Sequence, residues 1–313
     1  MKYLFGPVPS RRYGRSLGVD LAVPKTCTLS CRFCQLGPTP HTTVTRTETP
    51  DIDAVWTELR EWLAQGNTAD YITESGSGEP TLHLRFGDLL RRVRNETNCR
   101  SLLLSNGSLF FLPEVRRDAL AADVVKVSLH AWDQASFETV NRPHPSLRFQ
   151  AIIDGYRAFR EAFTGRLDVE VFLIPGVNDR DDQAAKIAAL VASFAPDSVT
   201  LNTAVRPPAD SSINPCPPER LEALLPLFGP HTHIGGKEPQ NVRIKFTQEA
   251  LIGLVERHPV SLSSLATTFE KTEDEFRALL QPLIAHGDIR LFPAVGRLFV
   301  GGGGEAASKK LKD

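Results

Sequence analysis

The chain has 313 residues, of which 41% are hydrophobic and 23% are charged, and its formal net charge is −1 at pH 7. This length favours one large and one small domain, and this composition is typical of a globular protein with a sizeable core. The small net charge gives no overall attraction to nucleic acid, and no apolar run is long enough to cross a bilayer. The start has no signal-peptide pattern, so we expect a cytoplasmic protein whose thiols stay reduced.

Six short apolar segments predict β-strands, and each is followed by a segment with helical spacing of apolar residues. The strands are expected at 17–22, 70–76, 101–107, 124–130, 167–176 and 198–203. The helices are expected at 51–66, 84–95, 114–122, 147–163, 182–194 and 219–228. This alternation predicts an α/β fold with a parallel sheet, either an open partial barrel or a doubly wound sheet.

The sequence pattern changes beyond about residue 240. Residues 240–301 predict helix, turn, helix, long helix and two short strands, the proportions of a winged helix-turn-helix with N-caps at Ser261 and Thr272. We therefore expect a barrel domain over residues 1–235 and a small winged-helix domain over 240–301. The Gly-rich and then polar residues 302–313 predict a disordered tail.

Candidate functional residues follow the expected strands, where the chemistry of such folds is found. The stretch KTCTLSCRFCQLG (25–37) comes after the first strand. Those that follow or end later strands are residues 76–80, 105–107, Ser128 with His130, residues 175–179 and Arg206. We expect all of them at one face of the sheet.

Three cysteines, Cys27, Cys31 and Cys34, lie within eight positions and can converge on one compact site. A structural zinc ion would need a fourth ligand, which His41 could supply. A redox dithiol would use two cysteines and leave the third unexplained. A 4Fe–4S cluster held by three thiolates would leave one iron open for another ligand. The spacing alone leaves these three interpretations open.

The segment CTLSCRFC resembles the signature of the radical S-adenosylmethionine (SAM) superfamily, in which an aromatic residue, here Phe33, precedes the last cysteine. The resemblance covers roughly residues 1–228 and implies a partial (β/α)6, TIM-like barrel. It implies that Cys27, Cys31 and Cys34 bind a 4Fe–4S cluster. The open iron would bind the methionine amino and carboxylate groups of SAM.

The resemblance also implies cofactor-binding roles for residues after later strands. Residues 76–80, Gly-Ser-Gly-Glu-Pro, are similar to the Gly-Gly-Glu-Pro motif of the family, and they depart from it at Ser77. Gly78 and Glu79 would contact the methionine ammonium. The other implied cofactor residues are Ser105, Asn106 and Ser128, near the ribose and the methionine carboxylate, and Gly176, near the adenine. The alternatives are a tight turn with a solvated glutamate, a common Asn-Gly turn and a satisfied strand hydroxyl.

The chemistry implied by the resemblance is radical formation from SAM. A reduced cluster donates one electron, the carbon–sulfur bond breaks, and the resulting 5′-deoxyadenosyl radical abstracts hydrogen from a substrate. A reducing partner such as flavodoxin or ferredoxin is implied as well.

Several arginines before or after the expected strands suggest an anionic substrate, because a guanidinium binds carboxylate or phosphate with two parallel hydrogen bonds. They are Arg11, Arg12, Arg15, Arg142 and Arg206. The alternative is that they are solvated or paired with surface acids. His130 and His144 are candidates for proton transfer or polar contact, and the alternative is a core or surface histidine.

The segments FGPVPSRR, NRP and LNT…RPP also resemble enzymes that form wyosine-type tRNA bases, which makes a tRNA guanosine one candidate substrate. Those enzymes carry a second cluster on three further cysteines, whereas this chain has two, Cys99 and Cys216. The segment EKTEDEFRALLQ, where a recognition helix would lie, carries four acids and two bases and would repel phosphate. RNA therefore stands beside an unidentified small molecule or protein as the substrate.

A second class of function is a transcription regulator with an Fe–S sensor and a winged-helix DNA reader. The acidic helix argues against it, as does the set of cofactor motifs, which a sensor does not need. SAM cleavage and operator binding would separate the two classes.

Overall fold

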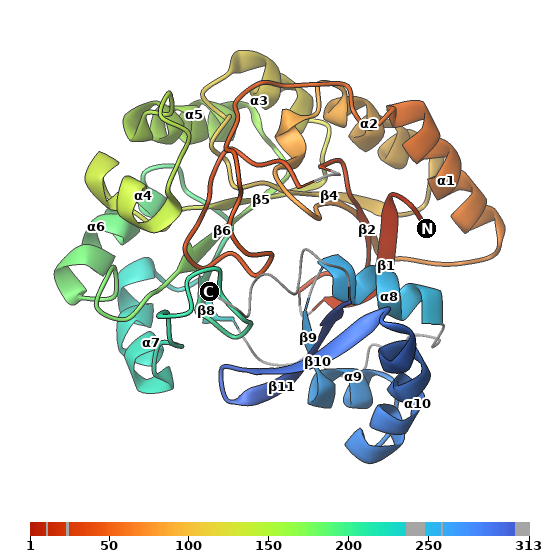
Figure 1. Cartoon of the computed structure of the whole chain (residues 1–313). Coiled ribbons are helices and arrows are strands. Elements are labelled where there is room, and N and C mark those ends of the chain that lie inside the picture. Colours follow the sequence, from red (N-terminus) through yellow and green to blue (C-terminus); the bar gives the residue numbers. More distant parts are fainter. Residues whose placement is uncertain (11, 23–24, 236–247, 258, 304–313) are drawn as a thin grey trace.

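The computed structural model describes residues 1–10, 12–22, 25–235, 248–257 and 259–303, which form an α/β fold (Figure 1). Eight strands form one sheet in sequence order. They are β1 Leu4–Ser10, β2 Gly14–Val19, β3 Tyr71–Glu74, β4 Arg100–Leu104, β5 Val124–Ser128, β6 Arg166–Phe172, β7 Ser198–Asn202 and β8 Thr232–Ile234. Strands β2 to β8 are parallel, so the predicted α/β fold with a parallel sheet is confirmed.

Two edge strands were not predicted. Strand β1 pairs antiparallel with β2, and its sequence, LFGPVPS, contains two prolines, which remove ladder donors and are tolerated at an edge. Strand β8 pairs with β7 and has three residues, too few to show a periodicity. The expected strand at 17–22 begins earlier, at Gly14, and ends at Val19.

Helices surround the sheet on its outer side (Figure 1). They are α1 Ile52–Ala64, α2 Phe86–Glu96, α3 Pro113–Ala119, α4 Gln134–Asn141, α5 Phe149–Ala162, α6 Asp181–Ala192 and α7 Pro218–Leu224, with short 3₁₀ turns at Pro80–Leu82 and Leu225–Phe228. Helix α4 is additional to the six predicted helices. Its start is marked by a capping box in which the Asp133 side chain accepts from Ser136 N and the Ser136 side chain bonds back to the Asp133 backbone.

The C-terminal unit packs on the edge of this sheet at β1. Its elements are α8 Gln248–Arg257, β9 Val260–Ser261, α9 Leu262–Thr268, α10 Glu273–His286, β10 Ile289–Ala294 and β11 Arg297–Gly302. The unit has its own buried apolar cluster, against which Val8 of β1 also packs. The predicted N-caps are confirmed, since Ser261 accepts from Ser264 N and Thr272 accepts from Glu275 N.

The predicted disordered tail, residues 302–313, starts too early, because its first two residues are described and hydrogen-bonded. Gly302 belongs to β11 and pairs with Ile289, so it is strand. Gly303 is described as well, and its N donates to the Asp288 carbonyl oxygen at 2.8 Å. Residues 304–313 lie outside the described residues, as does the expected domain junction near residue 240. Within the described residues, no helix combines the length and the hydrophobicity that crossing a membrane requires.

Glu74, the last residue of β3, is buried without a partner and is expected to lower stability. It is 1% exposed, and neither carboxylate oxygen has a hydrogen-bond partner among the described residues. Burial raises the pKa of Glu74 well above its ordinary value, although Arg91 acts in the opposite direction. Because the folded-state pKa is raised, the protein loses stability as pH rises above the ordinary pKa of the unfolded chain.

Replacement of this carboxyl with an apolar side chain of similar length is therefore expected to stabilise the fold. Glu74→Met should raise the free energy of unfolding at pH 8 by roughly 1–3 kcal/mol, with a smaller gain near pH 4. Denaturant unfolding at the two pH values measures the difference. Glu61→Met, at an exposed position of α1, is the matched control. An equal gain for both variants at both pH values would contradict this explanation.

Candidate active site

The three clustered cysteines lie beside one cavity of about 380 Å³ at the carboxyl ends of the strands. The cavity combines the cysteine loop, the loop after β3, Asn106 after β4 and residues of β5, β6 and the segment after β7. The predicted site residues that line it are Cys27, Cys31, Phe33, Cys34, Gly78, Glu79, Asn106 and Arg206. The structure thus brings together residues that are up to 179 positions apart (27 to 206).

Helix α4 carries part of the cysteine loop. The loop N–H groups of Ser30 and Arg32 donate to the carbonyl oxygens of Asn141 and Val140 at the end of the helix, both at 3.1 Å. These carbonyls have no partner within the helix, so the loop satisfies them and is fixed in place. Leu29 forms an isolated antiparallel bridge with Pro143, just beyond the helix.

The sulfur of each of the three clustered cysteines accepts a hydrogen bond from a side-chain N–H group. Asn106 Nδ2 lies 3.5 Å from Cys27 Sγ, and Asn141 Nδ2 lies 3.2 Å from Cys31 Sγ. Lys25 Nζ lies 3.8 Å from Cys34 Sγ. Donors of this kind stabilise negative charge on sulfur, which a metal-bound thiolate carries.

Burial of Cys27 and Cys31 favours the protonated form of these two thiols when no metal is bound. Burial raises the pKa of Cys27 to about 12 and raises the pKa of Cys31 as well. Among the described residues, no three His, Cys, Asp or Glu side chains are grouped so that they could hold one metal ion. A 4Fe–4S cluster does not need such a group, because each thiolate binds a different iron.

The loop after β3 is packed tightly against the cysteine loop. Gly76 has φ +128°, and an added Cβ there would overlap the Asp20 carboxylate. A Cβ at Gly78 would overlap the Thr26 carbonyl oxygen, to which Glu79 N also donates at 3.0 Å. Glycine is therefore required at both positions, and the two loops form one wall of the cavity.

Glu79 is buried, 1% exposed, and its carboxylate links this loop to the end of β4. Its Oε1 accepts from Ser105 Oγ at 2.7 Å and from Thr81 N and Oγ1, and its Oε2 accepts from Asn106 N at 2.7 Å. Burial raises the pKa of Glu79, and these donors oppose the rise. Ser105 thus reaches the site through Glu79 and does not line the cavity.

Phe33 forms an aromatic wall beside the thiols. Its ring stacks on Phe172 of β6 with the centroids 4.1 Å apart, and it meets His130 edge-on at 4.8 Å. An aromatic side chain before Cys34 is therefore explained by its packing against Phe172 and His130. Phe33 joins the cysteine loop to β6.

A half-buried charge network forms the floor of the cavity. Lys126 Nζ of β5 lies 3.2 Å from Glu170 Oε2 of β6, and Arg12 Nη2 lies 3.5 Å from the same oxygen. Burial alone would raise the pKa of Glu170, but Lys126 and Arg12 together lower it to about 2. Arg12 comes from the β1–β2 turn and also donates to Thr200 Oγ1, so it lies beneath the floor and does not line the cavity.

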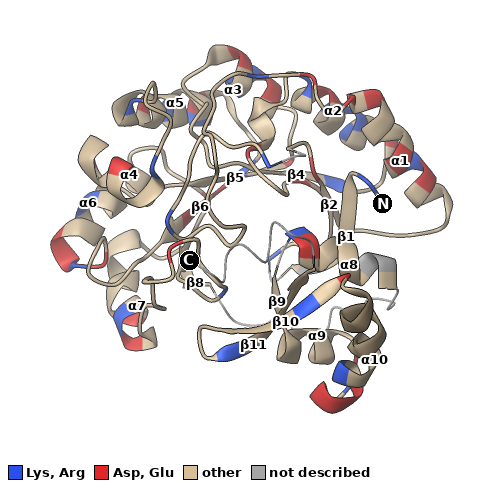
Figure 2. Ribbon diagram, in the orientation of Figure 1, with Lys and Arg blue, Asp and Glu red and all other residues tan. Residues whose placement is uncertain are grey.

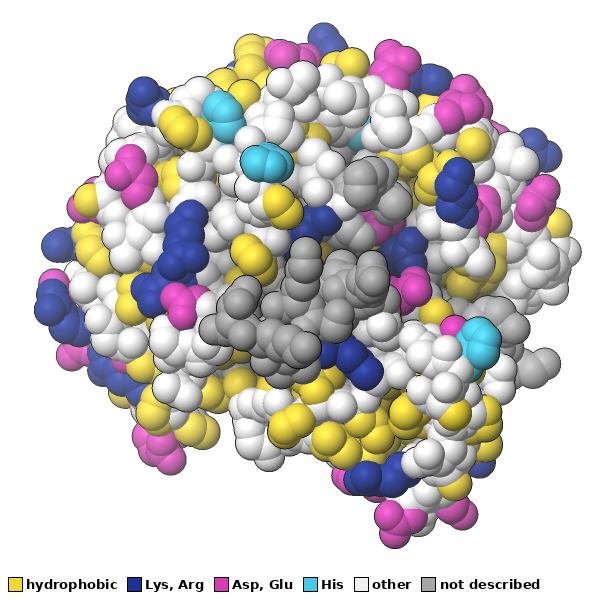
Figure 3. Space-filling model, viewed as in Figure 1, with side chains coloured by type: hydrophobic (Ala, Val, Ile, Leu, Met, Phe, Trp, Pro, Cys, Tyr) yellow, Lys and Arg dark blue, Asp and Glu magenta, His cyan; other side chains and the backbone are white. Residues whose placement is uncertain are grey.

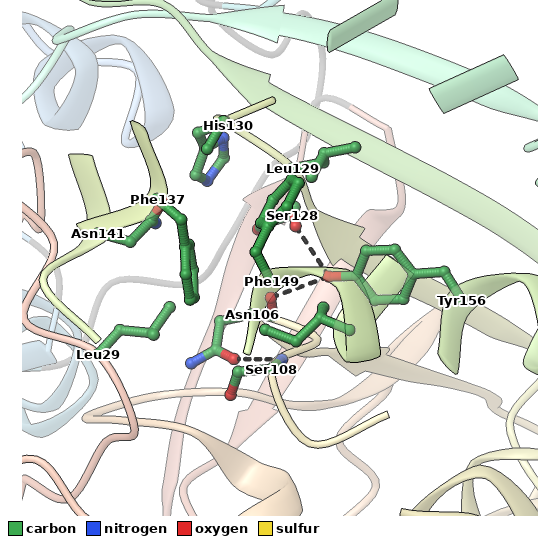
Figure 4. A pocket seen from close by; sticks show the side chains of 12 residues that line it. Leu29, Asn106, Ser108, Ser128, Leu129, His130, Phe137, Asn141, Phe149 and Tyr156 are labelled. Atoms are coloured by element: carbon green, nitrogen blue, oxygen red, sulfur yellow. Dashed lines mark hydrogen bonds between the residues drawn. The ribbon is translucent and has the colours of Figure 1, made fainter. Parts of the chain in front are cut away.

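Ser128 and His130 line a separate, small cavity of about 20 Å³, together with Asn106 and Tyr156 (Figure 4). The Tyr156 hydroxyl donates to the backbone oxygen of Ser128 at 2.9 Å and contacts that of Asn106 at 3.2 Å. His130 Nδ1 accepts from Phe172 N at 2.8 Å, and burial lowers its pKa to about 4. His130 is therefore a neutral histidine of the core. This agrees with the alternative given above, a core histidine, and not with a role in proton transfer.

Other candidate residues are not brought to the cavity. Arg15 pairs with Asp70 at the opposite, amino-terminal ends of β2 and β3, and both side chains are more than a third exposed. Arg142 lies 3.7 Å from Asp210 and is half exposed, and Gly176 is exposed on a turn. The further residues absent from the cavity wall are His41, Cys99, His144 and Cys216, and Arg11 lies outside the described residues.

Arg206 does line the cavity, as predicted, and its Nη1 donates to Gln35 Oε1 at 2.7 Å. Sequence reasoning missed Lys25, Asn141, Lys126 and Glu170. The signal for Asn141 was the capping box at Asp133, which begins a helix that ends beside Cys31. Lys126 and Glu170 are polar residues within apolar strands, a pattern that indicates a functional interior.

The fold and the three thiols define a class of partial-barrel enzymes in which a cysteine loop follows the first parallel strand. The sequence matches the radical SAM superfamily over residues 22–188. The chain therefore belongs to the radical SAM superfamily, whose members bind a 4Fe–4S cluster and SAM.

Two curated relatives show how far the similarity extends. The chain is 27% identical over 311 residues to a UPF0026 protein of Methanocaldococcus jannaschii, and the alignment covers 96% of this chain and 95% of that protein. It is 32% identical over 296 residues to a GTPase Obg of Brachyspira hyodysenteriae, covering 92% of this chain. The chain spans 43% of the length of that second protein. The sequence printed above has no Gly-x4-Gly-Lys-Ser/Thr phosphate-binding loop.

A solved structure with the same fold is that of Streptococcus suis SuiB bound to precursor peptide SuiA. Its TM-score is 0.52 at 13% sequence identity, and the match covers 70% of this chain and 48% of that chain. At this identity the likeness concerns the fold alone.

Proposed function

We propose that this chain is a radical SAM enzyme in which Cys27, Cys31 and Cys34 bind the 4Fe–4S cluster and the fourth iron binds SAM. One observation carries the proposal: the three thiols share a cavity wall with Gly78 and Glu79. When bound and reduced, the cluster supplies the electron that cleaves SAM to methionine and a 5′-deoxyadenosyl radical, which takes hydrogen from a substrate.

The donor set fits a cluster. Three thiolates from one loop are the ligands that iron–sulfur clusters take, and Asn106, Asn141 and Lys25 direct N–H groups at the sulfurs. Neither remaining cysteine supplies a fourth thiolate: Cys99 Sγ donates to Ala69 O at the far end of β3, and Cys216 is absent from the cavity wall. Three cysteine ligands leave one iron for SAM.

The chain's own residues would orient SAM and exclude water. Among the described residues, Glu79 Oε2 accepts one hydrogen bond, from Asn106 N, so it has capacity for the methionine ammonium. Phe33 and Phe172 form an apolar wall that keeps solvent from a reactive carbon radical. Lys126, Glu170 and Arg206 are polar groups in the remaining wall and are the substrate-facing candidates.

Electron paramagnetic resonance of the anaerobically reconstituted, dithionite-reduced chain tests the proposal. We expect iron and sulfide at about four each per chain, and a cluster signal that changes when SAM is added because SAM binds an iron. A cluster whose signal is insensitive to SAM would overturn the open-iron assignment. Absence of any cluster would overturn the whole proposal.

The hydrogen bond from Asn141 to Cys31 is expected to raise the cluster potential. Asn141→Leu removes an N–H donor that stabilises the more negative, reduced cluster. Loss of about 1 kcal/mol corresponds to a shift on the order of 40 mV toward more negative potential for one electron. A redox titration measures it. Thr139→Leu, on the same helix but exposed, should leave the potential unchanged, and an equal shift in both variants would contradict the assignment.

The proposal includes a reducing compartment and an electron donor. Thiols that bind iron must stay reduced, which favours the cytoplasm, and a flavodoxin or ferredoxin would reduce the cluster. A photoreduced flavodoxin that supports SAM cleavage in place of dithionite would support this part of the proposal.

The order of elements in the C-terminal unit supports a winged-helix fold for residues 240–301, beside a barrel domain over 1–235. Helix α8, strand β9, helices α9 and α10 and the β10–β11 hairpin follow one another, with β9 paired to β11. The first turn of α10 carries Glu273, Asp274 and Glu275, red in Figure 2, and hydrophobic side chains gather over β10 and β11 (Figure 3).

An acidic and hydrophobic surface binds the phosphates of nucleic acid poorly. A DNA-binding regulator and an enzyme that acts on tRNA are therefore the less favoured alternatives. A gel shift with bulk tRNA at low salt tests the RNA substrate, and absence of a shift would remove it.

A further inference from the structure

Arg257, the last residue of α8, joins the C-terminal unit to the barrel through a buried ion pair. Its Nε donates to Asp20 Oδ2 at 3.0 Å, and its Nη2 donates to the Lys2 carbonyl oxygen at 2.9 Å. The guanidinium also lies over the Phe5 ring, 5.5 Å from its centroid. The side chains of Arg257 and Asp20 are 10% and 0% exposed. Removal of one partner from an ion pair so withdrawn from water is strongly destabilising, because the other charge is left buried and unpaired.

Asp20 is also the residue that holds the loop after β3. Its Oδ2 accepts from Ser77 Oγ at 2.6 Å, and its Oδ1 accepts from Ser77 N and Ala22 N, both at 3.1 Å. Gly76 packs so closely on this carboxylate that no Cβ fits between them. The adjoining residues Gly78 and Glu79 line the cavity beside the thiols. The chain of contacts therefore runs from α8 through Asp20 to the cavity wall.

Arg257 supplies the cation that pairs with the buried Asp20 carboxylate. Without that cation, the carboxylate would lose its ion-pair partner, and a buried carboxylate left without one is costly. Relaxation that relieves this cost would displace the Asp20 oxygens to which Ser77 donates, and the loop would lose its fixed position. A cofactor loop that is not held in place binds its ligand more weakly, because ordering it must then be part of binding.

We propose that Arg257 is a positioning residue for residues 76–79, so that docking of the C-terminal unit sets the affinity of the barrel for SAM. The inference rests on the proposed function, because SAM is the ligand whose affinity changes. The coupling is reciprocal: a substrate or partner that moves α8 changes SAM affinity, and SAM changes the affinity of that ligand by the same factor.

Equilibrium dialysis with labelled SAM, on the full chain with reconstituted cluster, tests this inference. Arg257→Met is expected to weaken SAM binding about tenfold or more, with iron and sulfide content unchanged. Arg257→Lys should recover part of the affinity, because it restores the charge but not the forked hydrogen bonds. Arg277→Met, at an exposed position of α10, is the matched control and should bind SAM as the wild type does.

A second variant guards against loss of folding. Ser77→Ala removes one bond to Asp20 but leaves the ion pair, so it should fold normally and weaken SAM binding by a smaller factor. Unchanged SAM affinity in Arg257→Met or in Ser77→Ala, beside a wild type that binds SAM, would overturn this inference and leave the proposed function standing. A wild type with a full cluster that binds no SAM would overturn both.

Discussion

Cys31→Ala is expected to abolish SAM cleavage and to reduce the iron content of the reconstituted chain to a small fraction of the wild-type value. Cys31 is the middle one of the three cysteines in the sequence, its sulfur accepts a hydrogen bond from Asn141, and it lines the cavity. Loss of one of three thiolates leaves two irons without a protein ligand, so the cluster is not retained. Iron and sulfide analysis and the visible absorption of the cluster measure the effect.

Cys99→Ala is the matched control, because it removes a thiol of the same chain outside the cavity. Its Sγ bonds to the Ala69 carbonyl oxygen, so the variant should keep full iron content and cleavage activity. A Cys31→Ala protein with a complete cluster would contradict the three-thiolate assignment. Equal loss of iron in both variants would indicate a general defect in folding.

Glu79→Ala is expected to have the second largest effect, on both stability and SAM binding. The change leaves Ser105 Oγ, Thr81 N and Asn106 N without their buried acceptor. An unsatisfied buried donor costs about 1–3 kcal/mol, so we expect a loss of about 3 kcal/mol in the free energy of unfolding. SAM binding should fall at least a hundredfold, since the ammonium loses its carboxylate.

Denaturant unfolding and equilibrium dialysis measure the two effects separately, and iron content shows whether the cluster remains. Glu161→Ala, an exposed change in the last turn of α5, should alter neither quantity. Wild-type SAM affinity in a folded Glu79→Ala protein would show that Glu79 is a structural cap of the β4 turn and does not contact the cofactor.

The parallel sheet could be predicted because its strands are buried on both sides and read as short apolar runs between helical segments. Strand β1 could not, because its prolines argue against a strand and its place at an edge is a property of the tertiary fold. Helix α4 was missed because it has eight residues and follows β5 closely, so its few apolar positions gave little periodicity.

The site residues that could be predicted are those that belong to a short sequence motif. Cys27, Cys31, Cys34, Gly78 and Glu79 fall in two short segments, and the structure places both segments on one cavity. The partners of these residues come from distant segments, such as Asn141 for Cys31. Spacing along one sequence has no signal for such pairs.

The arginine predictions show the same limit. Arg12 and Arg15 are three positions apart, yet Arg12 lies under the cavity floor beside Glu170 while Arg15 pairs with Asp70 near the surface. The β1–β2 turn separates them, and that turn depends on an edge strand that the sequence did not indicate. Arg257 was not among the predicted residues, and its partner Asp20 lies 237 positions away in the sequence.

The central claim is that this chain cleaves SAM with a reduced cluster, and the most direct measurement is 5′-deoxyadenosine formation. The reconstituted chain, reduced with dithionite under anaerobic conditions, should form 5′-deoxyadenosine and methionine in equal amounts. Omission of the reductant, or the Cys31→Ala change, should stop this reaction. A wild-type chain that carries a full cluster and binds SAM, yet forms no 5′-deoxyadenosine above the Cys31→Ala level, would contradict the claim.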